Sequence, residues 1–217
     1  MSAIIDHLRS FNRKERFFLV GTALGNPDFR LGCAFRQRLS DTLALEVPSD
    51  AFVAMDYHLD WIQASAYLSR DGVSASDVHS NAAGLVSGNQ EDVDLIVAFD
   101  GSTATHVIML EAKAETGWTN KQAGSKAKRL TKIFGKEGRD FPQLQPHFSL
   151  MSPRRPLQLQ TDCWPTWMRT LEGAPLWMEL TVPPGRMKLT RCDGAGKQTR
   201  DGGYFKVQPT DSKGARR

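Results

Sequence analysis

The sequence predicts an α/β fold in which helices flank a central mixed β-sheet. Two observations support this: two short runs that are apolar on both faces flank a DG turn signal, and apolar residues recur at helical spacing before and after them. The chain has 217 residues, 40% of them hydrophobic, which is enough for one sizeable core. We expect a helical N-terminal part at 1–48, a core at 49–152 and a small β-rich C-terminal extension at 153–217, all in one compact domain.

Three helices are expected in the first seventy residues. Asn12 and Glu15 have the spacing of a capping box, so one helix is predicted to begin with Asn12 as its N-cap and to be broken by residues 25–27. A second apolar run at helical spacing covers 29–43. A third helix is predicted to open at Pro48. Its single apolar stripe consists of Phe52, Met55, Leu59, Ile62 and Ala66.

A β-hairpin is expected where the pattern changes to short runs of strand-forming residues. The runs are 92–99 and 106–113, and the turn signal begins at Asp100. Both runs are apolar on both faces, which is typical of central strands covered on each side. Residues 71–90, before the hairpin, are rich in Gly, Ser, Asn and Ala and are expected to form a loop.

A helix is predicted to follow the hairpin from 119 to 134, where Gly135 ends it. Residues 147–151 are expected to form a further strand. The last part of the chain is expected to contain short strands joined by Gly/Pro turns, and its end is expected to be a frayed tail. The predicted strands are 177–182, 187–191 and 204–208, and the tail is 210–217.

Two acids and one lysine are predicted to meet at one end of the hairpin. If Phe99 pairs with His106, Asp94 lies opposite Glu111 on the same face, with Cβ atoms about 5 Å apart. Two carboxylates that close repel each other and are costly to desolvate, and a divalent cation such as Mg²⁺ relieves both costs. Lys113, on the same face, adds the positive charge that suits phosphodiester hydrolysis. The alternative is a salt-bridged strand end at the surface.

The order of these residues along the chain forms a short motif. Asp94 is on the first strand, residues 111–113 read Glu-Ala-Lys at the end of the second, and Gln122 is on the next helix. This arrangement resembles the PD-(D/E)XK nuclease superfamily over residues 50–150. Val93 stands where the motif has proline.

The resemblance implies a restriction-endonuclease-like core and a metal-dependent nuclease. Mg²⁺ or Mn²⁺ would be bound by Asp94, Glu111 and the backbone carbonyl of Ala112. Lys113 would assist the attacking water and the transition state, and Gln122 would position the water or the phosphate. The implied substrate is nucleic acid, with DNA expected before RNA, and a homodimer is one expected form. The alternative is a nucleic-acid-binding or assembly module that keeps the fold without turnover.

Members of this superfamily often carry a further acid on the helix before the hairpin. Asp56 and Asp60 are the candidates, and Asp56, which lies nearer the apolar stripe, is the one expected to face the sheet. A solvated helix flank is the alternative for both. His58, between them, could be a catalytic base, but a half-buried structural histidine is the preferred interpretation.

The predicted helix at 119–134 is rich in lysine and contains no acid. Lys121, Lys126 and Arg129 are candidates for contact with nucleic-acid phosphates, since neutralising phosphates dominates nucleic-acid affinity. A solvated helix face is the alternative. Trp118, just before this helix, could stack on a base, and a cap or core role is the other interpretation.

The composition bears on the partners and the cellular compartment that we expect for the chain. The net charge of +4 permits a polyanionic partner without demanding one. Cys33, Cys163 and Cys192 form no CxxC pair, which argues against a disulfide framework or structural zinc, so a reducing cytoplasm is expected. The apolar runs are too short to span a bilayer, so no membrane partner is expected. A small-molecule hydrolase is disfavoured because the chain has no nucleophile elbow and no His-rich metal motif.

Overall fold

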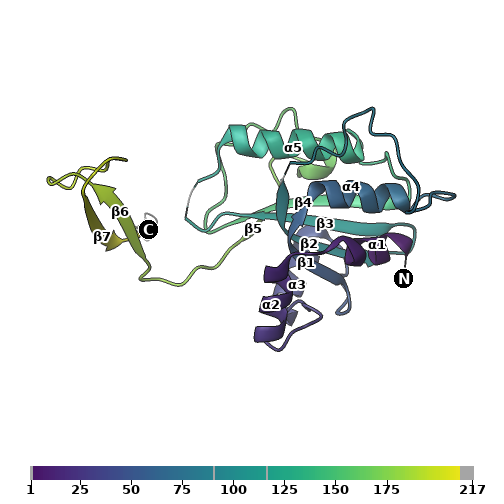
Figure 1. Ribbon diagram of the computed structural model, residues 1–217, viewed down its shortest axis with the longest axis horizontal. Coiled ribbons are helices and arrows are strands. Elements are labelled where there is room, and N and C mark those ends of the chain that lie inside the picture. Colours follow the sequence, from purple (N-terminus) through teal and green to yellow (C-terminus); the bar gives the residue numbers. More distant parts are fainter. Residues whose placement is uncertain (1, 90, 116, 211–217) are drawn as a thin grey trace. The chain divides into compact units, whose positions relative to one another are not determined.

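The structure is a computed structural model that describes residues 2–89, 91–115 and 117–210. It shows an α/β protein with a five-stranded mixed sheet, helices that pack on the sheet, and a two-stranded hairpin in the C-terminal part (Figure 1). The α/β class predicted from the sequence is therefore confirmed. None of the described helices is both long and apolar enough to cross a membrane.

The central sheet has the strand order β1-β2-β3-β4-β5. The first three strands form an antiparallel meander, β4 runs parallel to β3, and β5 runs parallel to β4. Helix α5 lies between β3 and β4 in the chain because parallel neighbours need a long crossover connection. The strands are β1 (Phe52–His58), β2 (Asp92–Asp100), β3 (Thr105–Ala112), β4 (Leu144–Ser152) and β5 (Trp177–Glu179).

The predicted hairpin is confirmed as β2 and β3. Phe99 pairs with His106, the register that was assumed in placing Asp94 opposite Glu111. Alternate residues belong to different cores: Ile96 and Met109 lie in the core on one face of the sheet, and Val97 lies in the core on the other. Both strands are apolar on both faces because each face is covered.

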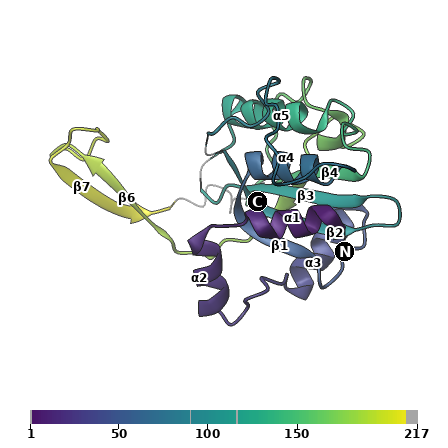
Figure 2. The same cartoon turned by 45° about the vertical axis from the view of Figure 1, so that its right-hand side comes forward.

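Helices cover the two faces of the sheet unequally. Figures 1 and 2 show α4 and α5 on one side of the sheet and α3 on the other. Helices α1, α4 and α5 bury apolar side chains in the larger core, whereas α3 closes the smaller core with Leu39. The helices are α1 (Ala3–Phe11), α2 (Glu15–Ala23), α3 (Cys33–Leu43), α4 (Leu59–Leu68) and α5 (Asn120–Phe134), with a 3-10 turn, η1 (Thr166–Met168).

The capping box predicted at Asn12 is wrong. Asn12 is the C-cap residue of α1, and α2 begins at Glu15 after Lys14. The α1 segment forms a helix because its apolar residues reach the core; Leu8, for example, is fully buried. The second helix does end before residues 25–27, as predicted.

The third helix was predicted to open at Pro48, but it begins at Leu59 because residues 52–58 form β1. Asp56 interrupts this strand with a φ of 48°, in the left-handed region. Its neighbours Met55 and Tyr57 pair with β2 in one constant register. A strand followed directly by a helix produces the same apolar stripe as one long helix.

The C-terminal boundary is also corrected. The chain divides into Met1–Leu180 and Thr181–Arg217, so neither the break at 152 nor the single compact domain holds. The reason is that β5, assigned to the extension, pairs with β4. The second unit contains β6 (Met187–Cys192) paired with β7 (Tyr204–Pro209), both predicted from the sequence. Most of the expected tail, 211–217, lies outside the described residues.

Candidate active site

The two predicted acids come together at one end of the hairpin. Asp94 shares the face of Ile96, and Glu111 shares the face of Met109, so both lie on the side of the sheet that α5 covers. Oδ2 of Asp94 accepts a hydrogen bond of 2.5 Å from the backbone N–H of Ala112. This bond links β2 to β3 beyond the end of their ladder, and it holds the first acid beside the Glu-Ala-Lys segment.

Glu111 has a perturbed pKa. Burial raises its pKa to about 7. Lys126 and Lys113 lower the pKa, and the neighbouring Asp94 carboxylate raises it. Even with both lysines beside it, this carboxyl group binds a proton near neutral pH, and a further cation would favour its charged form, which makes Glu111 a strong candidate for a functional residue.

Lys126 supplies a cation at this position. Its side chain is mostly buried, and its Nζ lies 3.5 Å from Oε2 of Glu111 and 4.0 Å from Oε1 of Glu91. The ammonium also donates a hydrogen bond to the backbone carbonyl of Asp92. Lys126 was predicted to contact nucleic-acid phosphates, and its burial among acids corrects that prediction.

Neither the position of Glu91 near Lys126 nor the inward orientation of Lys126 was predicted from the sequence. A signal for Lys126 was present, because it lies three residues after Ala123 and four before Leu130, both on the buried side of α5. Glu91 immediately precedes β2 and gave no comparable signal.

Arg129 is also turned inward, which corrects its predicted phosphate contact. Its guanidinium lies 2.5 Å from Oδ1 of Asp60 on α4 and donates to the backbone carbonyl of Leu85. Asp60 further accepts hydrogen bonds from the backbone N–H groups of Ser87 and Gly88, at 3.0 and 2.7 Å. Burial by itself would raise the pKa of Asp60, but these hydrogen bonds and Arg129 lower it. Asp60 therefore anchors the 71–89 loop to α5.

Asp56 was expected on a helix facing the sheet, and this expectation is wrong. It lies in β1, and its carboxylate pairs with Arg16 at 2.9 Å. His58 is largely buried, with Nδ1 3.0 Å from Oδ1 of Asp92 and its ring centroid 4.5 Å from that of Trp61. These contacts agree with the structural histidine preferred from the sequence.

Lys113 and Gln122 both line a hollow beside Glu111. The hollow has a volume of about 480 Å³. The Nζ of Lys113 lies 5.8 Å from the ring centroid of Trp118, whose indole N–H donates to Oγ of Ser152 at 3.2 Å. Trp118 therefore forms a wall. The residues that line the hollow include Glu91, Glu111, Lys113, Trp118, Lys121, Gln122 and Lys126.

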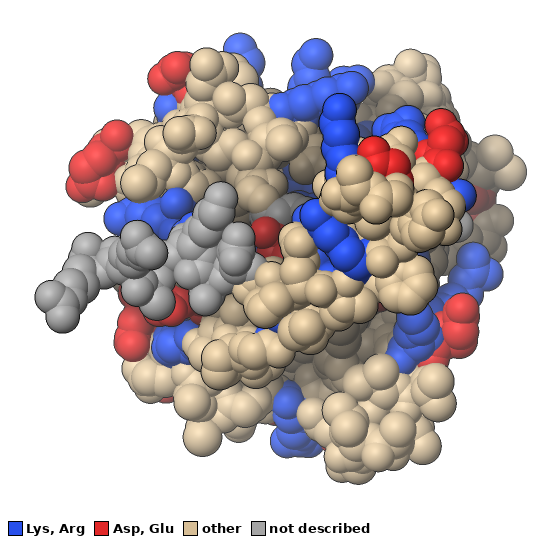
Figure 3. Space-filling view, turned by 90° about the vertical axis from the view of Figure 1, so that its left-hand side faces the viewer, with Lys and Arg blue, Asp and Glu red and all other residues tan. Residues whose placement is uncertain are grey.

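The first turn of α5 opens onto this hollow. The side chain of Thr119 caps the helix by accepting from the backbone N–H of Gln122 at 3.3 Å. Lys121 is exposed and lines the hollow, and its contact with phosphates stays a prediction. In the space-filling view of Figure 3, Lys and Arg side chains gather along the upper part of the face, with Asp and Glu side chains among them. The charge on that face is therefore mixed.

The donor set fits a hard divalent cation with few protein ligands. Asp94 and Glu111 offer carboxylate oxygens, and Ala112 offers a carbonyl. Oε2 of Glu111 is buried, and among the described residues it accepts no hydrogen bond but forms an ion pair with Nζ of Lys126 at 3.5 Å. Within that part of the chain, no three His, Cys, Asp or Glu side chains converge closely enough to hold a metal. Mg²⁺ suits such a site because it retains several water ligands.

Comparison of the chain with protein-family models, with curated proteins and with solved structures finds no match.

Proposed function

We propose that the chain is a metal-dependent nuclease of the PD-(D/E)XK type, which hydrolyses phosphodiester bonds in nucleic acid, with DNA as the expected substrate. One observation carries the proposal: Asp94 and the buried Glu111 meet at the end of a central hairpin, beside a hollow lined by Lys113 and Gln122. Acids held close in a mostly buried position, with a perturbed pKa, are characteristic of a functional site.

Asp94, Glu111 and the carbonyl of Ala112 would hold Mg²⁺ or Mn²⁺. When bound, the ion polarises a phosphoryl oxygen and makes a water molecule more acidic. The raised pKa of Glu111 supports this assignment, since a nearby cation favours the charged form of a buried carboxyl group.

The remaining residues bind and orient the substrate. Lys113, beside the Trp118 ring, stabilises negative charge on the phosphate that is attacked. Gln122, in the first turn of α5, orients that phosphate or the water. The N-terminus of this helix itself favours anions. Lys121 neutralises a neighbouring phosphate of the strand. Lys126 stabilises the ionised form of Glu111.

Cleavage assays on supercoiled plasmid, linear duplex and single-stranded DNA, each with Mg²⁺, Mn²⁺ or EDTA, test the proposal. We expect metal-dependent cleavage by the wild type, none by Glu111→Gln, and undiminished cleavage by Glu137→Gln, which changes an exposed acid. Equal cleavage by the wild type and Glu111→Gln would refute the assignment.

The alternative is a nucleic-acid-binding or assembly module without turnover. The position of Lys126 favours it specifically, because a lysine ammonium already lies where it pairs with Glu111. Melting curves separate the two functions. A metal site raises the melting temperature with Mg²⁺ or Mn²⁺, whereas a non-catalytic module of this kind shows no such rise and no cleavage.

A further inference from the structure

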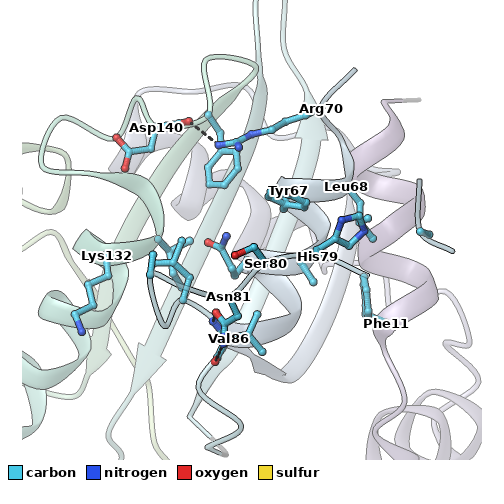
Figure 4. A pocket seen from close by; sticks show the side chains of 17 residues that line it. Phe11, Tyr67, Leu68, Arg70, His79, Ser80, Asn81, Val86, Lys132 and Asp140 are labelled. Atoms are coloured by element: carbon cyan, nitrogen blue, oxygen red, sulfur yellow. Dashed lines mark hydrogen bonds between the residues drawn. The ribbon is translucent and has the colours of Figure 1, made fainter. Parts of the chain in front are cut away.

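A second cavity lies on the same side of the sheet as the acids but shares no lining residue with the hollow around Glu111. It is enclosed by α4, the 71–89 loop and the C-terminal part of α5 (Figure 4). Its volume of about 350 Å³ is within the range of small-molecule sites. Most of its lining is apolar, and includes Phe11, Tyr67, Leu85, Val86, Ile133 and Phe141.

The loop that closes this cavity is held in place by its own contacts. The side-chain amide of Asn81 both accepts from the backbone N–H of Val86 and donates to its carbonyl, at 3.0 and 2.8 Å. The Asp60–Arg129 pair holds the loop at Leu85 and Gly88. The cavity is therefore preformed, which is the usual condition of a binding site for a small ligand.

The walls of the cavity carry flat π-surfaces. The rings of Tyr67 and His79 have centroids 5.1 Å apart. The guanidinium of Arg70 lies 5.3 Å from the Tyr67 ring and 4.6 Å from the Phe141 ring, and it donates to the backbone carbonyl of Asp140 (Figure 4). Such walls favour an aromatic ligand, since a flat ring stacks on aromatic and guanidinium planes.

A buried amide in the lining is unpaired. Gln63, on α4, is 4% exposed, and its Oε1 has no hydrogen-bond partner among the described residues. A buried acceptor without a donor is unfavourable, and turning this amide toward the cavity would let a ligand N–H satisfy it. A glutamine amide complements with both its donor and its acceptor a base edge that carries an acceptor beside a donor, and the N7 and N6–H edge of adenine is one such edge.

The rim of the cavity has an excess of positive charge. Lys132 and Arg70 are cationic, and Asp140 is the acid beside them. Lys132 is exposed and has no ion pair among the residues that the structure describes. It can therefore bind a phosphate at the mouth of the cavity.

We infer that this cavity binds an adenine nucleotide, with the base between the aromatic walls and against Gln63, and the phosphate at Lys132. The adenine arrives either as a free mononucleotide or as a base of a single strand. The inference stands independently of the proposed nuclease, because none of its residues contacts the acids.

Isothermal titration calorimetry of the full chain in EDTA tests the inference, with AMP, adenosine, GMP and a short oligo-dA as the ligands. We expect AMP to bind better than adenosine, and GMP about tenfold more weakly, because guanine offers no donor on that edge. Gln63→Leu should weaken AMP binding about tenfold while leaving the protein folded, because it removes an unpaired acceptor. Lys132→Ala should weaken AMP binding but not adenosine binding.

Two variants serve as matched controls. Lys128→Ala removes an exposed lysine one turn earlier in α5, and Gln145→Leu removes an exposed glutamine of β4; neither lines the cavity. Both should bind AMP like the wild type.

Binding of AMP would identify a free mononucleotide as the ligand, whereas binding of oligo-dA alone would identify a base of a single strand as the ligand. No binding of any adenine ligand at about 1 mM, equal binding of GMP, or full binding by Gln63→Leu would overturn the inference.

Discussion

Replacing Glu111 by glutamine should make the metal-free protein more stable at alkaline pH, although it removes the central acid of the site. The Glu111 side chain is only 18% exposed, and burial raises its pKa to about 7 from an ordinary value of 4.5. The folded chain therefore prefers this group in its neutral form. Glutamine has nearly the shape of that neutral form and cannot ionise.

The size of the effect follows from the pKa. At about 1.36 kcal/mol for each pKa unit, ionising Glu111 costs the folded chain about 3 kcal/mol more than the unfolded chain. Below pH 4.5 the group is protonated in both states and costs nothing. Between pH 4.5 and 7 the folded state binds more protons, so the free energy of unfolding falls as pH rises. The stability gained by Glu111→Gln should grow over this window and level off near pH 8.

Urea unfolding in EDTA at pH 4.5 and pH 8 measures this gain, with Glu137→Gln as the exposed control. The wild type and Glu111→Gln should unfold at similar urea concentrations at pH 4.5. At pH 8 the variant should be more stable by about 3 kcal/mol. A variant that is equally stable or less stable at pH 8 would show that Glu111 is ionised without strain, and the argument for a site that needs a cation would fail.

Three other outcomes are expected. Lys113→Ala should reduce the rate of DNA cleavage about 100-fold or more with an unchanged melting temperature, and cleavage at the wild-type rate would contradict its role. Mg²⁺ at about 100 times its Kd should stabilise the wild type by about 2.7 kcal/mol in urea unfolding, and Asp94→Asn should lose this effect. Arg129→Met should lower the free energy of unfolding by about 3 kcal/mol, because it leaves Asp60 without its cation, and should speed proteolysis of the 71–89 loop; a stable, protease-resistant variant would contradict this.

The hairpin could be predicted because its determinants are local. The turn signal at Asp100 placed the hairpin, two apolar faces showed that both strands are central, and the register assumed for the turn is the one observed. The position of Asp94 beside Glu111 follows from that register alone. Helix α5 was predicted within one residue, and Gly135 ends it as expected.

Residues 52–58 were mistaken for a helix because a strand and a helix in sequence can share one apolar stripe. Phe52 is buried on β1 and Leu59 on α4, yet their spacing fits a single helix. Only pairing with β2, some forty residues later in the chain, distinguishes the two.

The inward positions of Lys126 and Arg129 depend on partners from other elements. Asp60 is on α4 and Glu111 on β3, so the sequence around α5 contains no sign of either carboxylate. A lysine on a helix usually faces solvent. Here the buried acids reverse that preference, since burial of a charge requires a partner.

Three basic residues of α5 occur at steps of three: Lys126 at the acids, Arg129 at the loop anchor and Lys132 at the second cavity. Helix α5 is rigid, and its buried face includes Leu130. A substitution that shifts α5 along its axis would disturb all three contacts together, so one mutation there would produce several defects with one cause. Loss of activity in a variant of the α5 core would therefore not show which of the three contacts had failed. Variants of Glu111 on β3 and of Gln63 on α4 leave α5 unchanged, so each of them tests one cavity alone.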